Sequence, residues 1–439
     1  MKPILLSSLL ALVLHQAYAQ TEVTATLAGH AILPAKTFLK MPEDAPEDLQ
    51  VSGKFTTGER VEKIGSVEGK SDGRPTGLAL PFEGQSVQGH SGIVVNKDGT
   101  VWLLTDNGFG SKANSSDAAL FLRRYKIDWE KGILEPLETV FLRDPNKVVP
   151  YRIVHEDTKS RYLTGADFDL ESVQWIDGKL WLGDEFGPYL IKANKNGVVE
   201  GVYPTIVEGN IIQSPDNPAL KLPSKPDEKM PAFQAKRSKG FEGMAAAPNG
   251  GLLYPLLEGP LFVNGEYESV DGKVVLRILA FDTKKEKYTD KYWFYPLEVS
   301  EHAIGDFNMI DDEYGLIIER DNLEGASDRA CSEVAVDTKN CFAKPAKFKR
   351  VYKVRLPKDR RVVEKIAYID LMNIKDPNNK ARKDLNDGVF TFPFFTIEDV
   401  GVVDGSHIIV GNDIVKSLII QSIQSRYKEQ LVVELSKIN

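Results

Sequence analysis

Residues 169–187 read DLESVQWIDGKLWLGDEFG, and this stretch decides the fold class. An acidic start leads into a short apolar strand, then Asp177-Gly178, then a second apolar strand that ends in Asp184-Glu185. Asp-Gly suits a tight hairpin turn because both residues tolerate positive φ. Runs of β-branched and aromatic residues on both sides of such a turn predict two antiparallel strands.

The same pattern recurs four more times along the chain. Each copy has a polar or acidic start, an apolar strand, a turn that contains glycine, and a second strand that ends in an acid or asparagine. These copies cover residues 89–110, 240–259, 304–322 and 396–413. No stretch shows a sustained helical period, so we predict an all-β protein. Repeated sheets without helices between them are typical of a β-propeller, whose blades stack to form the core.

We predict six blades, within a range of five to seven, and long loop insertions. Five blades come from the repeats, and a sixth is expected from residues 21–84 with the C-terminal strands IIQSI and LVVEL. Residues 20–439 are predicted to form one domain, although this length would more often make two or three. A pair of β-sandwiches remains the alternative, because strand patterning alone does not fix closure of a ring.

Residues 1–19 are predicted to be a secretory signal peptide. Lys2 supplies the positive start, and residues 4–14 are apolar but too short to span a bilayer. Residues 17–19, Ala-Tyr-Ala, form a small-x-small cleavage site. We therefore expect cleavage after Ala19, no membrane span, and a periplasmic or extracellular location.

The composition excludes several classes of protein. The chain has 63 acidic and 55 basic residues, and its formal charge of −8 does not fit an unaided nucleic-acid binder, which needs a basic face. Two cysteines cannot build a four-thiolate zinc site. In an oxidising compartment, Cys331 and Cys341 are instead predicted to close a local disulfide loop. We expect the protein to be a monomer.

The repeats place acids at two equivalent positions, which we name strand-start and strand-end positions. Equivalent positions of different blades converge on the axis of a propeller, because all inner strands run along it in the same sense. Converging carboxylates repel one another unless a cation compensates them, and many oxygen ligands without cysteine favour Ca²⁺ over zinc. The predicted calcium ligands are Glu171, Glu242, Asp306 and Glu398 at strand starts, and Asp106, Asn107, Asp184, Glu185, Glu258, Glu319 and Asp413 at strand ends.

The strand-start acids carry more weight than the strand-end acids, which are also ordinary turn formers. Glu171, Glu242 and Glu398 each follow an apolar residue and begin a strand, where glutamate has poor propensity. Asp167, Asp169 and Glu171 alternate, so all three face one side of an extended segment and form a local acidic cluster.

Basic residues beside the repeats are candidates for binding an anionic substrate. They are Arg320, Lys239 and Arg124, and arginine can grip phosphate or carboxylate at two points. A surface charge is the alternative for each of them. His90 adjoins a strand-start position and is the histidine candidate for acid–base catalysis, beside Glu242 and Glu171 as general bases.

The passages GHSGI from residue 89, DLESVQW from residue 169, GFEGMA from residue 240 and TIEDVGVV from residue 396 carry a family resemblance. Together they resemble the bacterial phytase-like family, described as "esterase-like activity of phytase". The resemblance covers most of the chain after the signal peptide. It implies a secreted propeller rich in acids that hydrolyses phosphoesters or other esters, with Ca²⁺ as the expected cofactor. Ser91 stands where other repeats have an acid, so the acidic ring is incomplete there.

The leading hypothesis is a Ca²⁺-dependent hydrolase of a small anionic phosphoester. A propeller carboxylesterase or lactonase that uses the same metal is the second hypothesis. The third is a non-catalytic binding propeller in which calcium only stabilises the fold.

Overall fold

The structure, a computed structural model, describes residues 20–71, 74–87, 89–225, 229–332, 341–412 and 417–425. The predicted signal peptide, its cleavage site, Asp413 and the predicted C-terminal strand LVVEL at residues 431–435 lie outside the described residues. Within them, regular structure is β apart from two short 3₁₀ helices, η1 (Glu47–Gln50) and η2 (Ser327–Arg329). The prediction of an all-β protein is confirmed.

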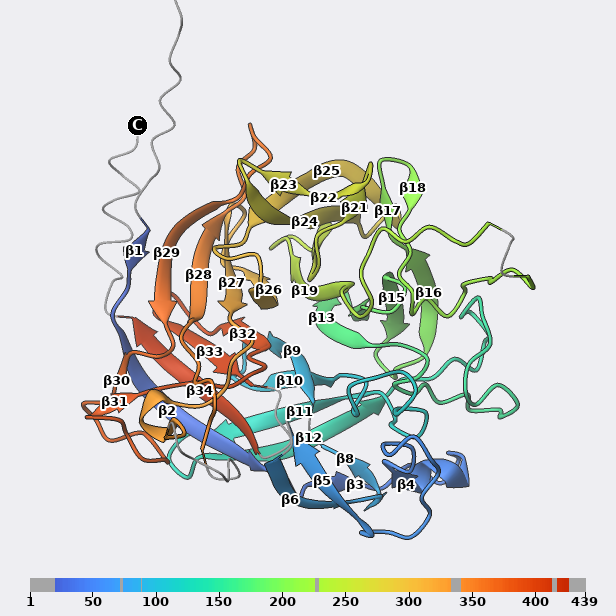
Figure 1. Cartoon of the computed structure of the whole chain (residues 1–439), viewed down its shortest axis with the longest axis horizontal. Helices are drawn as coiled ribbons and strands as arrows, with labels where there is room; N and C mark the ends of the chain where they lie inside the picture. The colour runs from blue at the N-terminus through green and yellow to red at the C-terminus, as the bar shows by residue number, and fades with distance from the viewer. Residues whose placement is uncertain are drawn as a thin grey trace, which may run out of the picture.

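Five antiparallel sheets surround a central axis and form the blades of a propeller (Figure 1). Blade 1 has β9 (His90–Val95), β10 (Val101–Thr105), β11 (Phe121–Asp128) and β12 (Ile133–Phe141), and blade 2 has β13 (Leu170–Ile176), β14 (Lys179–Asp184), β15 (Tyr189–Asn194) and β16 (Val199–Pro204). Blade 3 has β19 (Phe241–Ala246), β20 (Leu252–Leu257), β24 (Lys273–Asp282) and β25 (Lys287–Pro296), and blade 4 has β26 (Ala303–Met309), β27 (Tyr314–Arg320), β28 (Lys349–Arg355) and β29 (Glu364–Asp370). Blade 5 has β32 (Asp399–Val402), β33 (His407–Gly411), β34 (Ser417–Ser425) and β2 (Ala25–Pro34).

The expected number of six blades is wrong, and five is the lower end of the predicted range. The N-terminal segment does not build a blade of its own, because β2 pairs with β34 and completes blade 5. In this way the two ends of the chain close the ring. Further along, the N-terminal segment forms three two-stranded ribbons outside the blades. They pair β3 (Phe38–Leu39) with β8 (Gln85–Ser86), β4 (Val51–Ser52) with β7 (Phe82–Glu83), and β5 (Val67–Ser71) with β6 (Arg74–Leu80).

Small additional strands pair with strands of three blades. They are β1 (Thr21–Glu22) on blade 4, β23 (Ser269–Val270) on blade 3, and β30 (Ile374–Lys375) with β31 (Val389–Phe390) on blade 5.

The apolar core is divided among the five interfaces between neighbouring blades. Trp102 of blade 1 packs in one cluster with Val173 of blade 2, and Ile409 of blade 5 packs in another with Leu103 of blade 1. Three further clusters fill the remaining interfaces. A pair of sandwiches would place each core between two facing sheets. The ring of interfaces instead establishes the propeller, in which each blade packs on its two neighbours.

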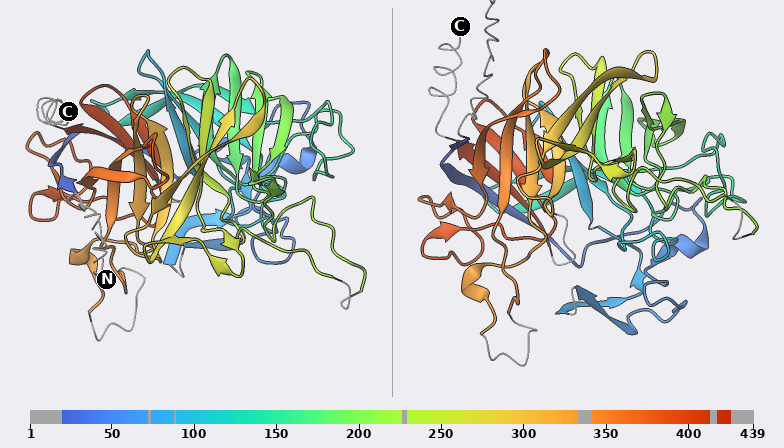
Figure 2. Two further views of the ribbon diagram at one scale, coloured as in Figure 1. Left: turned by 90° about the horizontal axis from the view of Figure 1, so that it is seen from above. Right: turned by 45° about the horizontal axis from the view of Figure 1, so that its top comes forward.

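The two ends of the propeller differ. Tight turns such as Asp177-Gly178, where φ is 49° and 73°, join strands at one end, which we call the hairpin face. Longer connections such as residues 106–120, 142–169 and 258–272 leave from the other end, the loop face (Figure 2). The inner strands β9, β13, β19, β26 and β32 all begin at the loop face, so the strand-start positions meet there.

The predicted disulfide between Cys331 and Cys341 is present, with Cα atoms 4.9 Å apart. It closes a loop in the connection between β27 and β28, which also belongs to the loop face.

The ring closure contains a histidine that must stay neutral. His30 on β2 is 1% exposed, its Nδ1 accepts from the backbone N–H of Arg382 at 2.9 Å, and burial and then the cationic Lys383 and Arg382 lower its pKa to about 4. A group whose folded-state pKa is lowered costs stability as the pH falls from its unfolded pKa toward the folded one. Between pH 7 and pH 4.5 the free energy of unfolding should fall in both proteins. In urea unfolding we expect this fall to be about 2 kcal/mol smaller for His30→Gln than for the wild type. Equal losses in both proteins would contradict this role of His30.

Candidate metal centre

Two glutamates lie in β-bulges at the starts of inner strands. In blade 2, Leu170 pairs with Asp184 and Ser172 with Gly183, so that Glu171 is an extra residue in the ladder. Glu242 occupies the same place in blade 3, between the pairs of Phe241 with Leu257 and Gly243 with Leu256. A bulge changes the direction of a side chain and is frequent beside functional sites. The bulges explain how glutamate is tolerated at the start of these buried strands.

Three strand-end acids are held at the same level by one repeated backbone contact. The backbone N–H groups of Asp106, Glu185 and Glu258 each donate at 2.8 Å to the carbonyl of a residue just before the neighbouring inner strand. Those carbonyls belong to Gly89, Asp169 and Gly240 respectively. Because the contact is the same in three blades, strand-end and strand-start acids from different blades meet at the axis.

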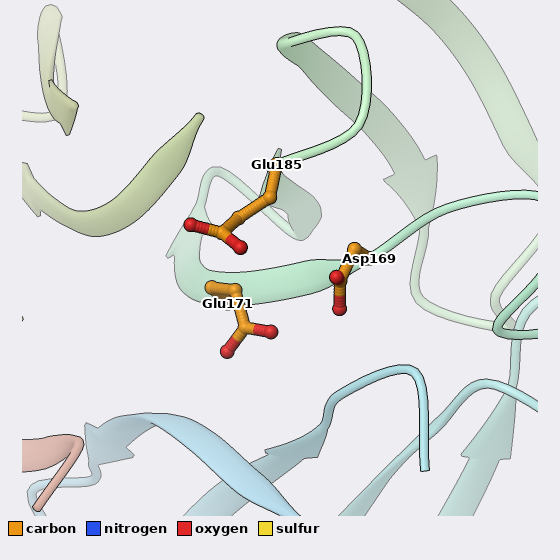
Figure 3. A group of neighbouring side chains, drawn as sticks. All are labelled: Asp169, Glu171 and Glu185. Atoms are coloured by element: carbon orange, nitrogen blue, oxygen red, sulfur yellow. The ribbon is translucent and has the colours of Figure 1, made fainter. Parts of the chain in front are cut away.

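The carboxylates form two overlapping triads. Ligand oxygens of Asp169, Glu171 and Glu185 all lie within 4.8 Å of one another, as do those of Glu185, Glu242 and Glu258. Figure 3 shows the first triad, with Asp169 and Glu171 at the start of β13 and Glu185 after β14. Glu185 belongs to both triads. We name the whole group, with its neighbours Asp106 and Glu398 and the cations Arg320 and Lys239, the axial cluster.

The axial cluster holds more negative than positive charge. Six of its seven carboxylates belong to buried residues, and Asp106 is half-buried. Burial, followed by the repulsion of neighbouring acids, raises the pKa of Glu171, Glu185 and Glu242 well above the usual value, and the pKa of Asp106 likewise. Burial also raises the pKa of Asp169. Two cations cannot neutralise seven carboxylates, so bound protons or a further cation must compensate the rest.

Both cations of the axial cluster are already engaged with carboxylates. Arg320 Nη2 lies 3.0 Å from Glu398 Oε1, and Lys239 Nζ pairs with Glu258. Burial alone would lower the pKa of both bases, but the surrounding acids outweigh it and raise both. In blade 1 the strand-start position is taken by Ser91, whose Oγ donates to Glu398 Oε2 at 3.0 Å.

The donor set fits a calcium ion. Within the described residues, Glu185 Oε1 and Glu242 Oε1 are buried and have no hydrogen-bond partner, although a buried polar oxygen without a partner is costly. Both triads offer only carboxylate oxygens, which is the ligand chemistry of a hard divalent cation such as Ca²⁺.

Three predicted ligands lie near the axial cluster but are used for structure. Asp184 accepts from the backbone N–H groups of Asp169 and Gly187 at 2.9 and 2.7 Å, and burial raises its pKa to about 7. Asn107 donates to Asp169 Oδ1 at 2.8 Å and so orients that carboxylate. Asp306 accepts from the backbone N–H of Phe307 at 2.7 Å, and burial raises its pKa to about 7.

In blade 4 the strand-start and strand-end positions are shifted by one residue from the prediction. Ile304 pairs with Glu319, as Leu170 pairs with Asp184 in blade 2, so Gly305 takes the strand-start position. Arg320 therefore takes the strand-end position. The ring at the axis consequently has a cation in blade 4 where the sequence pattern suggested Glu319.

Glu319 lies in a separate buried network. Its Oε2 accepts from Lys365 at 2.6 Å and from the Tyr295 hydroxyl at 2.8 Å, and its Oε1 contacts His302 Nδ1 at 2.8 Å. Burial would raise the pKa of Glu319, but His302 and Lys365 lower it overall. This carboxylate is therefore satisfied by protein groups.

His90 and Arg124 also lie away from the axial cluster. His90 is fully buried beside Tyr125, with ring centroids 6.4 Å apart, and burial and then Arg123 lower its pKa to about 3. Arg124 pairs with Asp98 at 2.6 Å, near the hairpin face. The structure thus brings together eight of the predicted site residues, Glu171, Glu242, Glu398, Asp106, Glu185, Glu258, Arg320 and Lys239. Asp169, which was noted only as part of a local acidic run, joins them.

Fold and site together define a class of protein, a five-bladed propeller with a buried carboxylate cluster on its axis. Residues 85–413 match the family model described as "Phytase-like: Esterase-like activity of phytase". The chain belongs to this phytase-like family.

Other relatives are distant. An "Uncharacterized secreted protein" of Arthroderma benhamiae is 28% identical over 125 residues, which are 26% of this chain and 24% of that protein. Among solved structures, Myxococcus xanthus glutaminyl cyclase has a TM-score of 0.35 at 10% identity, covering 77% of this chain and 91% of its own. A putative 6-phosphogluconolactonase from Bacteroides uniformis has a TM-score of 0.30 at 15% identity, covering 80% and 90%. In the part of the chain that the structure describes, no helix is long and apolar enough to cross a membrane.

Proposed function

We propose that this protein is a secreted, calcium-dependent phosphoester hydrolase that acts at the axial cluster. The observation that carries the proposal is the excess of buried carboxylates, two of whose oxygens have no partner among the described residues. A cation is the simplest compensation for such an excess outside acidic solution. Secretion is supported by the signal-like N-terminus, the disulfide, and the secreted relative.

The ion would be held by the two triads, with Glu185 shared between them. Bound calcium would supply neutralisation of the phosphate charge and polarisation of a water molecule. This role requires oxygen ligands only, and both triads meet that requirement.

The chain's own residues supply the remaining chemistry. Arg320 Nε is buried without a hydrogen-bond partner in the described structure, so it can donate to a phosphate oxygen while Nη2 stays on Glu398. Lys239 adds a second positive charge beside Glu258. Burial and the neighbouring acids raise the pKa of Glu242, and a general base works best when its pKa lies near the operating pH, so a Glu242 oxygen that is not on the ion would accept a proton from water. Glu171 is the alternative base.

Hydrolysis of carboxylic esters is the second candidate, because the family description names an esterase-like activity. The two candidates are separated by assays with p-nitrophenyl phosphate, bis-p-nitrophenyl phosphate, phytate and p-nitrophenyl acetate, each with Ca²⁺ and with EDTA. Phosphate release that is lost in EDTA supports the proposal. Turnover of the acetate alone supports the esterase. If no substrate is turned over and Ca²⁺ only raises the melting temperature, both enzyme proposals fail and a binding propeller remains.

A further inference from the structure

A groove lies on the hairpin face, away from the axial cluster. It is a groove of about 600 Å³ between blades 1 and 2, lined by residues that include Trp102, Trp175, Lys97 and Lys195. Strand β9 runs from the loop face at His90 to the hairpin face at Val95, and the groove begins just beyond it. The groove and the axial cluster are therefore at opposite ends of the same blades.

The floor of the groove is aromatic. Trp102 of β10 and Trp175 of β13 stack with ring centroids 5.4 Å apart and an angle of 20° between the planes. Trp102 is buried in the interface of blades 1 and 2, whereas Trp175 is only half-buried. A tryptophan that lines an open groove offers a rigid apolar surface for another ring, and little side-chain entropy is lost when a ligand packs on it.

The two walls carry the same turn with the same cation. Residues 96–99 read NKDG in blade 1 and residues 194–197 read NKNG in blade 2. Both turns close with the first asparagine donating to the carbonyl four residues on, at 2.8 and 2.9 Å, and with the glycine donating back to it at 3.0 and 2.9 Å. The repeat places Lys97 and Lys195, both exposed, on the walls of the groove.

The charges in the groove favour an anionic ligand. Arg124 pairs with Asp98 at 2.6 Å and also donates to Thr100 Oγ1 at 3.0 Å, so its charge is compensated within the wall. The negative charge of Glu138 balances one of the two charges of Lys97 and Lys195. The groove lining therefore keeps one positive charge in excess. The amide of Asn196 lines the same groove and can bind hydroxyl groups. Asn96, whose Nδ2 donates to Thr100 Oγ1 at 3.0 Å, adds its amide oxygen as an acceptor.

We propose that this groove binds an acidic oligosaccharide. The apolar face of one sugar ring packs on Trp175, the carboxylate groups of the sugar meet Lys97 and Lys195, and hydroxyl groups bond to the asparagine amides. A sugar is favoured over a purely ionic ligand because an aromatic floor gains little from inorganic anions. This site does not depend on the function of the axial cluster.

The test uses calorimetry and tryptophan fluorescence on the full chain with trigalacturonate, and with maltotriose as the uncharged match. Trigalacturonate is expected to bind, to quench tryptophan emission, and to bind about tenfold more weakly in the Lys97→Ala/Lys195→Ala double variant. Affinity should fall as salt is added, because the lysines are exposed. Trp175→Ala should show a similar loss, and the lysine variant keeps the proposal testable if that protein does not fold.

A variant of the axial cluster separates the two sites. Glu242→Gln should bind trigalacturonate as the wild type does. Loss of binding in this variant would place the sugar at the axis and overturn the groove site. The groove site would also be overturned if trigalacturonate did not bind at about millimolar concentration. The same holds if maltotriose bound as tightly as trigalacturonate, or if the double lysine variant bound trigalacturonate as tightly as the wild type.

Discussion

Replacement of Glu242 by glutamine is expected to reduce kcat for phosphoester hydrolysis by at least about 100-fold, the usual contribution of a general base. Glutamine has nearly the same shape but can neither accept a proton from water nor add a negative charge to the triad with Glu185 and Glu258. The fold should survive, because the change removes one of seven crowded carboxylates. In metal-free protein the melting temperature should therefore be equal to or above that of the wild type.

The matched control is Glu200→Gln, on a strand of blade 2 at the surface, where the carboxylate pairs with Lys179. This variant should keep both activity and stability, because exposed ion pairs contribute little. Unchanged activity of Glu242→Gln would refute the position of the active site. A loss of folding in that variant would instead show that the carboxylate has a structural role.

Replacement of Glu319 by glutamine is expected to destabilise the protein by about 3 kcal/mol. Glu319 is fully buried, and its loss of charge leaves Lys365, which is also buried, with Glu298 at 3.0 Å as its one acidic partner among the described residues. Calcium affinity should not change, because this network lies away from the axial triads. Urea unfolding gives the stability and calorimetry the affinity.

A comparable pair at the surface serves as the reference for Glu319. Glu313→Gln removes a carboxylate that pairs with Arg355, both about one-third exposed, and should cost less than about 1 kcal/mol. If Glu319→Gln kept its stability but bound calcium more weakly, Glu319 would belong to the metal site after all.

Local sequence patterns were sufficient to predict the hairpins and the convergence of the strand-start glutamates. The Asp-Gly turns and apolar runs are local signals, and the inner strands must run in one sense in any propeller. The number of blades depends instead on which distant strand joins β34. The pairing of β2 with β34 joins the two ends of the chain, and no local pattern reports such a contact.

At the site, some predictions named the residue next to the one that faces the axis. The cause is again strand pairing, which local sequence does not reveal. A bulge adds one residue to a strand, and neighbouring residues on a strand face opposite sides. His90 therefore faces the interior while Ser91 bonds to Glu398 at the axis. In blade 4 the pairing of Ile304 with Glu319 assigns the axial positions to Gly305 and Arg320. The sequence does not reveal where a bulge falls, so it cannot decide between adjacent residues.

The most direct test of the central claim, that the axial cluster holds a calcium ion, is a calorimetric titration of Ca²⁺ into the metal-stripped full chain, for the wild type and for Glu185→Gln. The wild type should bind with measurable heat, and an excess of about 100-fold over Kd should stabilise it by about 2.7 kcal/mol. Glu185→Gln should bind at least about tenfold more weakly, since Glu185 belongs to both triads. Absence of binding by the wild type, or equal affinity in the two proteins, would contradict the proposed metal centre.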